Sequence, residues 1–156
     1  MAEAAVLMPM AHVALPQAAG RGARAAPSSP AITRQGRAEQ LRRARAAAQP
    51  LRAAFPNVEQ LRIELRFEDP SSISPTAQVH VLYPPAPAFF TYRCPHSDCD
   101  GEFELEEAVR SAMSESAHSA RGSLLCGGAR TGKQSSKRPC ELRLTFDVSA
   151  QYPGGT

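Results

Sequence analysis

The clearest pattern in the chain is an alternation of apolar and charged residues near its middle. Leu61, Ile63, Leu65 and Phe67 occupy every second position, and arginine or glutamate stands between them. A period of two places the apolar side chains on one face of a β-strand and the charged side chains on the other. We therefore expect a strand with one buried face and one solvated face.

Two further strands are expected before residue 94. After a turn rich in proline and serine at 70–75, an alternation predicts a second strand whose core-facing residues are Ala77, Val79, Val81 and Tyr83. Residues 89–93, which include three aromatic residues, predict a third strand that ends directly before the first cysteine. The range 58–93 thus predicts a three-stranded antiparallel meander.

Two segments have helical periodicity. Residues 34–55 predict a basic amphipathic helix that Pro50 kinks near its end, with an apolar stripe that packs on the sheet. The stripe consists of Leu41, Ala44, Ala48, Leu51 and Phe55. A second helix is expected from about residue 103 to about residue 117, where four glutamates from Glu102 to Glu107 place negative charge near the positive end of the helix dipole.

With closing strands at 123–126 and 142–148, the pattern predicts an α+β fold. We expect a small antiparallel sheet of about five strands with two helices packed on one face. The domain would span residues 34–149. Residues 1–33, rich in alanine, proline, glycine and serine without a period, are predicted to be a disordered tail, and residues 150–156 a short second tail.

Charge is distributed unevenly along the chain. Residues 1–54 carry eight arginines and only two glutamates, so the formal net charge of +3 conceals a basic arm on a slightly acidic remainder. Basic arms are typical of proteins that touch nucleic acid or acidic protein surfaces. Alternatively, the base composition of the genome explains the excess of arginine, because sixteen arginines against two lysines are also typical of a bacterial genome rich in G and C.

All four cysteines lie in the C-terminal half. Cys94 and Cys99 are separated by four residues, and Cys126 and Cys140 by thirteen. Each pair lies where a predicted strand ends in a turn, and neighbouring proline and glycine residues supply tight turns. Two turns that each offer two thiolates form the ligand set of a tetrahedral structural zinc site. We predict one structural zinc ion bound by all four cysteines.

The segments Cys94-Pro-His-Ser-Asp-Cys99-Asp-Gly and Cys126-Gly-Gly, followed by Cys140, resemble the broad zinc-ribbon class. The resemblance covers about residues 88–148, with a zinc-ribbon-like part at 94–148, and it implies a structural metal rather than a particular function. Both spacings depart from the C-x2-C pairs usual in ribbons.

Other interpretations of the cysteines stay open. His96 or Asp98 could replace a cysteine as ligand, two disulfides could form in an exported protein, or the thiols could be free and buried. A catalytic zinc with three protein ligands is the enzymatic alternative. Residues 127–133 match the core of a phosphate-binding loop, but Gln134 stands where that loop needs serine or threonine.

The sequence predicts a non-enzymatic binding module, because no cysteine or histidine has an obvious catalytic partner. Residues 4–19 lack the early positive charge of an export signal, so a cytoplasmic protein is expected, and neither a membrane nor a small-molecule substrate is inferred. The partner would be nucleic acid or protein. The candidate contact residues are Arg37, Arg42, Arg43, Arg45, Arg130, Lys133, Lys137 and Arg138.

Overall fold

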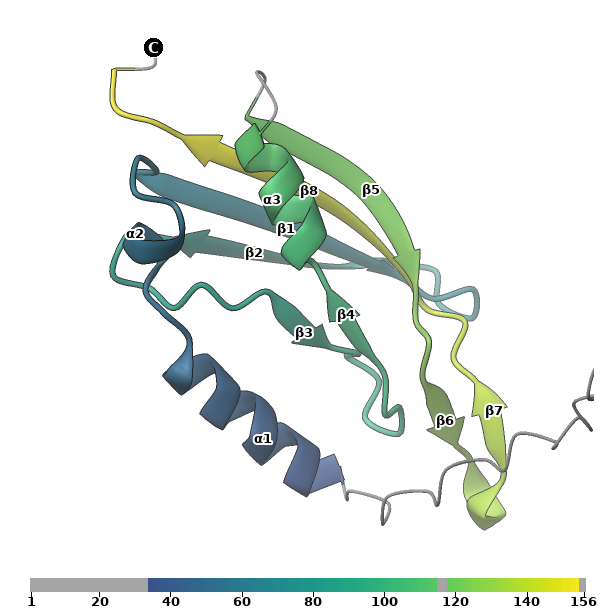
Figure 1. Ribbon diagram of the computed structural model, residues 1–156. Helices are drawn as coiled ribbons and strands as arrows, with labels where there is room; N and C mark the ends of the chain where they lie inside the picture. The colour runs from purple at the N-terminus through teal and green to yellow at the C-terminus, as the bar shows by residue number, and fades with distance from the viewer. Residues whose placement is uncertain (1–33, 115–117, 155–156) are drawn as a thin grey trace, which may run out of the picture. The chain divides into compact units, whose positions relative to one another are not determined.

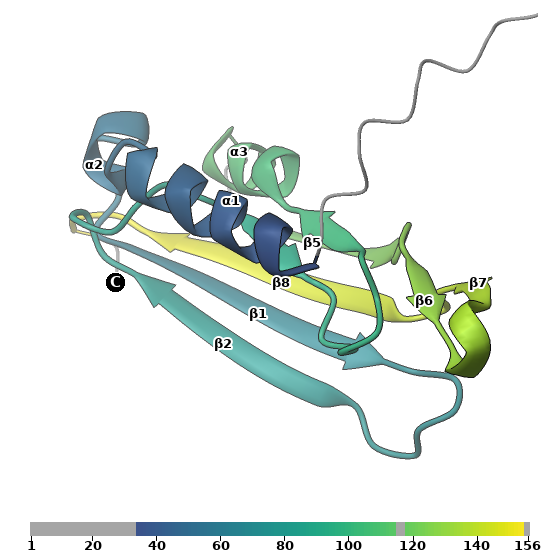
Figure 2. The same cartoon turned by 90° about the horizontal axis from the view of Figure 1, so that it is seen from below.

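The computed structural model describes residues 34–114 and 118–154, within the compact unit Ile32–Thr156. The predicted tail at 1–33, the predicted helix end near 117 and the last two residues lie outside these ranges. The described residues form an α+β fold in which helices lie over one face of an antiparallel sheet (Figures 1 and 2).

The main sheet has four strands in the order β2-β1-β8-β5. They are β1 (Gln60–Glu68), β2 (Thr76–Leu82), β5 (Ser119–Leu125) and β8 (Arg143–Gln151). The alternation predicted for β1 is confirmed, because its apolar residues are buried and its charged residues exposed. β8 continues to Gln151, two residues beyond the predicted end of the domain.

The orientation predicted for the second strand is wrong. β2 pairs with β1 so that His80 lies opposite Ile63 and Leu82 opposite Leu61. Paired residues on neighbouring strands point to the same face, so His80 and Leu82 face the core. Val79 and Val81 project from the outer face and are 51% and 37% exposed. The neighbouring strand, rather than the alternation within β2, decides which face is buried.

The predicted sheet of about five strands is also wrong, because the third strand leaves it. β3 (Thr91–Arg93) pairs with β4 (Glu102–Glu104) in a separate two-stranded sheet. The proline-rich connection that follows β2 runs instead toward a short helix, α2 (Leu51–Ala54). There the amides of Leu51 and Arg52 donate hydrogen bonds to the carbonyls of Ala86 and Pro84. A further two-stranded sheet joins β6 (Ala129–Thr131) to β7 (Lys137–Pro139), with a short 3₁₀ turn at Lys133–Ser135.

The first predicted helix is divided in two. α1 (Arg34–Ala47) ends before Pro50, and α2 (Leu51–Ala54) follows it. A proline ring clashes with the preceding helical turn, which explains the break. Contrary to prediction, α1 buries no residue, and of the expected apolar stripe only Leu51 is buried. α1 is held instead by polar contacts, including Arg45 over the ring of Phe89 at 5.4 Å.

α3 (Glu106–Ser114) begins three residues later than predicted, because Glu102–Glu104 form β4. Only Glu106 and Glu107 lie in its first turn, so two of the four glutamates are strand residues. Val109 and Ala112 are its buried residues. Across residues 34–114 and 118–154, none of the helices combines the length and apolar character that a membrane span requires.

Candidate metal centre

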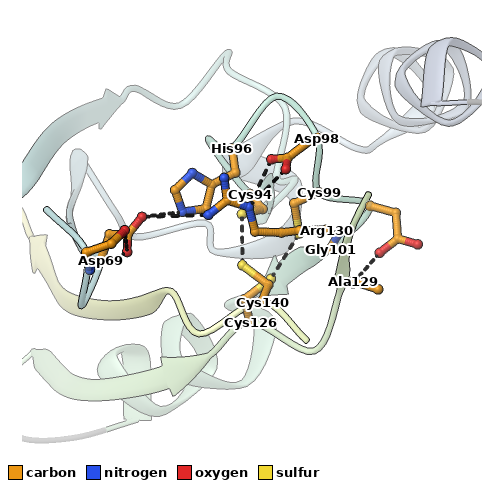
Figure 3. Close-up of polar contacts among 12 residues, drawn as sticks. Asp69, Cys94, His96, Asp98, Cys99, Gly101, Cys126, Ala129, Arg130 and Cys140 are labelled. Carbon is orange, nitrogen blue, oxygen red and sulfur yellow. Dashed lines mark hydrogen bonds and ion pairs between the residues drawn. The ribbon is translucent and has the colours of Figure 1, made fainter. Parts of the chain in front are cut away.

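The four cysteines meet at one end of the hydrophobic core. All four sulfur atoms lie within 4.8 Å of one another, and all four residues are buried (Figure 3). Cys94 directly follows β3, Cys126 directly follows β5 and Cys140 directly follows β7, whereas Cys99 lies in the loop between β3 and β4. Segments far apart in the sequence thus bring together a group that could hold a metal ion.

Two of the sulfur separations are close to those of a tetrahedral ligand set. Cys94 Sγ lies 3.9 Å from Cys140 Sγ, and Cys99 Sγ lies 3.6 Å from Cys126 Sγ. Four sulfurs at the usual zinc distance of about 2.3 Å would be about 3.8 Å apart. A disulfide requires about 2.05 Å, and all four cysteines are free thiols. The arrangement therefore favours one metal ion over two disulfides.

Backbone amides point at the sulfurs two residues before them. The amide of Gly101 donates to Cys99 Sγ at 3.3 Å, and the amide of Gly128 donates to Cys126 Sγ at 3.5 Å. The His96 amide donates to Cys94 in the same way. Hydrogen bonds to the charged form of a group favour that form, so these turns are suited to hold thiolates.

Two glycines allow the two cysteine turns to touch. A Cβ atom on Gly101 would collide with Cys126 Sγ, and one on Gly128 would collide with the backbone of Gly101. Gly127 directly precedes Gly128 but faces open space, where a Cβ atom would meet nothing within 4 Å. Only the absence of a side chain at Gly101 and Gly128 lets the backbones approach this closely.

Burial favours the neutral thiol form of Cys94 and Cys126 when no cation is present. Desolvation is the largest cause that raises the pKa of Cys94 far above its ordinary value and that of Cys126 to about 11; neighbouring cysteines contribute to both increases, and the backbone amides of His96 and Gly128 oppose them. Metals bind the thiolate, so a bound ion would replace the thiol protons and compensate the charge that burial disfavours.

A polar network joins the first cysteine loop to β6. Arg130 Nε donates to both carboxylate oxygens of Asp98, at 3.0 and 3.1 Å (Figure 3). The hydrogen bond from Arg130 is the main cause that lowers the pKa of Asp98. The Ala129 amide donates to Asp100 Oδ1 at 2.7 Å, and the Thr131 amide donates to the Asp98 carbonyl at 2.9 Å. Such contacts fix the positions of neighbouring ligands.

The alternative ligands are engaged elsewhere. His96 Nε2 lies 2.9 Å from Asp69 Oδ2, within ion-pair distance though without hydrogen-bond geometry. Asp98 is occupied by Arg130. The geometry thus favours the four-sulfur set over mixed ligation. Sequence reasoning missed Asp69 as the partner of His96 and Glu102 as the partner of Arg37, because the two residues of each pair lie far apart in the sequence.

Four of the eight predicted contact residues form ion pairs. Arg37 is held by Glu102, with Nε 2.8 Å from Oε2, and Arg130 by Asp98. In α1, Arg42 and Arg43 both contact Glu39. In the described ranges, Lys133, Lys137 and Arg138 have no ion pair, and all three are exposed on the β6–β7 hairpin.

Comparison with protein-family models, with curated proteins and with solved structures found no match for this chain. The candidate metal centre therefore rests on the geometry of its own residues. The segment that resembles a phosphate-binding loop lies in the β6–β7 hairpin, and a short 3₁₀ turn follows it instead of the helix that such a loop needs.

Proposed function

We propose that the four cysteines bind one zinc ion with a structural role, and that the module it stabilises binds nucleic acid. The observation that carries the first part is the set of four buried sulfurs that all lie within 4.8 Å of one another. A catalytic zinc keeps one position open for water or substrate. Four protein ligands, each at most 6% exposed, favour a closed structural site.

The proposed zinc ion would fix both ends of the β6–β7 hairpin. Cys126 precedes the hairpin, Cys140 follows it, and the Cys140 amide donates to the Gly128 carbonyl at 3.0 Å. The hairpin extends away from the main sheet (Figure 1). Metal binding would therefore help to orient the hairpin, together with the contacts that β6 makes with the first cysteine loop.

The hairpin is the part of the described surface best suited to phosphate groups. Residues 129–139 contain four cations and no carboxylate, and three of these cations lack an ion-pair partner within the described residues. Lysine and arginine bind phosphates irrespective of base sequence, with an affinity that falls steeply as salt rises. We therefore infer backbone contacts with nucleic acid rather than base-specific recognition.

The metal proposal predicts one zinc ion per chain in protein purified without chelators. Native mass spectrometry and elemental analysis measure this directly, and a strong chelator should then lower the melting temperature sharply. A folded protein without metal would contradict the proposal. So would a mass four hydrogens lower than that of the reduced chain, because it would reveal two disulfides.

The nucleic-acid proposal predicts that a variant with Lys133→Gln, Lys137→Gln and Arg138→Gln binds single-stranded nucleic acid more weakly. If three phosphate contacts are lost, the slope of log affinity against log salt should fall by about 2. Fluorescence anisotropy with a labelled oligonucleotide at several salt concentrations measures this slope.

The matched control removes three exposed cations elsewhere, with Arg52→Gln, Arg66→Gln and Arg143→Gln. None of these three arginines lies on the β6–β7 hairpin. We expect the control to retain most of the parent slope. An equal loss in both variants would mean that net charge alone attracts the oligonucleotide, and the hairpin would not be the binding surface.

A further inference from the structure

A cleft of about 640 Å³ lies beside the metal centre, between β4 and the end of β5. All of β4 lines one side, and Leu124 and Leu125 line the other. The two cysteine turns contribute Gly101, Gly127 and Gly128 at one end. The labels of β4 and β5 in Figure 1 mark the strands that border it.

The backbone of β4 is open toward one side. Cys94 donates its amide to the Gly101 carbonyl, and Leu105 donates its amide to the Phe90 carbonyl. Hydrogen bonding alternates along an antiparallel pair, so residues 101, 103 and 105 bond toward β3. The backbone groups of Glu102 and Glu104 therefore point to the opposite edge, where no other strand of the described chain pairs with β4.

The side chains around the cleft combine negative charge with exposed apolar surface. Asp100, Glu102 and Glu104 line it, and none of the residues that line it is basic. Arg37 forms an ion pair with Glu102 and also interacts electrostatically with Glu104, but Glu104 is exposed and forms no ion pair within the described residues. Leu125 is 67% exposed. Carboxylates repel phosphates, so this cleft cannot serve the proposed nucleic-acid surface.

We propose that this cleft binds an extended basic peptide from a protein partner, which pairs with the open edge of β4. An added strand obtains affinity from main-chain hydrogen bonds and specificity from alternate side chains. Arginine or lysine on the peptide would lie near Glu104 and Asp100, and apolar residues would cover Leu124 and Leu125. This interaction involves another class of partner and another surface than the β6–β7 hairpin, so it does not depend on nucleic-acid binding.

The test uses the full-length, metal-loaded protein and a fluorescein-labelled peptide in which arginine and valine alternate. We expect saturable binding by fluorescence anisotropy. Two control peptides separate charge from strand pairing: one carries glutamate in place of arginine, and the other is N-methylated at alternate residues. Each should bind at least about tenfold more weakly, because one loses charge complementarity and the other loses main-chain donors.

Two protein variants locate the peptide. Glu104→Lys should weaken binding about tenfold or more, whereas Glu68→Lys, an equal charge change on an exposed residue of β1 outside the cleft, should not. Both variants should melt at the parent temperature. Absence of saturable binding, equal affinity for the N-methylated peptide, or equal losses in the two variants would overturn the proposal.

Discussion

Cys126→Ser is expected to abolish stable zinc binding and to unfold the domain at physiological temperature. A serine hydroxyl is a poor replacement for a thiolate ligand, and the metal's binding free energy is part of the folding free energy. Structural zinc sites supply roughly 10–16 kcal/mol in small metal-dependent peptides, which exceeds the net stability of most domains. Circular dichroism and zinc analysis of the purified variant would measure both effects.

Ser97→Ala is the control for this variant. Ser97 is exposed and lies in the same loop as Cys94 and Cys99, so the change leaves the four sulfurs intact. We expect parent-like zinc content and a melting temperature close to that of the parent. If Cys126→Ser melted like the parent with no metal bound, the hydrophobic core alone would account for the fold.

Gly101→Ala is expected to damage the metal centre without removing a ligand. The new Cβ atom would collide with Cys126 Sγ, so either that sulfur or the glycine backbone must move. Overpacking a tight site costs about 1–3 kcal/mol, and zinc tolerates sulfur displacements of only about 0.2 Å. We expect a lower melting temperature and weaker zinc retention in competition with a chromogenic chelator.

Gly127→Ala provides the matched control, because a Cβ atom there meets no other atom within 4 Å. It adds the same methyl group to the other cysteine turn, next to Cys126. We expect a change in stability within about 0.5 kcal/mol and unaltered zinc retention. If the two alanine variants behaved alike, the close contact between Gly101 and Gly128 would not be needed for the site.

The position of the cysteines explains why the fold and the metal should be linked. Cys94, Cys99, Cys126 and Cys140 belong to the same buried cluster as Phe103 and Leu142. Loss of the proposed metal ion would remove the bonds that join the loops carrying these four cysteines. The effect should extend to β3 and β4, because β3 ends directly before Cys94 and β4 begins three residues after Cys99.

Local patterns predicted some elements well and others poorly. β1 was predicted correctly because its charged and apolar residues alternate without exception. In β2 the alternation is weaker, because apolar Leu82 follows apolar Val81, and the register with β1 reversed the predicted faces. The apolar stripe of α1 was misleading, since alanine contributes little surface to burial and the helix is held by arginine contacts.

The sequence by itself determined the central strand, the α+β class and the candidate ligands, because these depend on residue types and short spacings. Only the tertiary structure decided that the four sulfurs lie within 4.8 Å of one another, that Arg37 and Arg130 form ion pairs, and that an acidic cleft borders β4. These features depend on which distant segments meet, and strand register and backbone contact fix that only after the chain has folded.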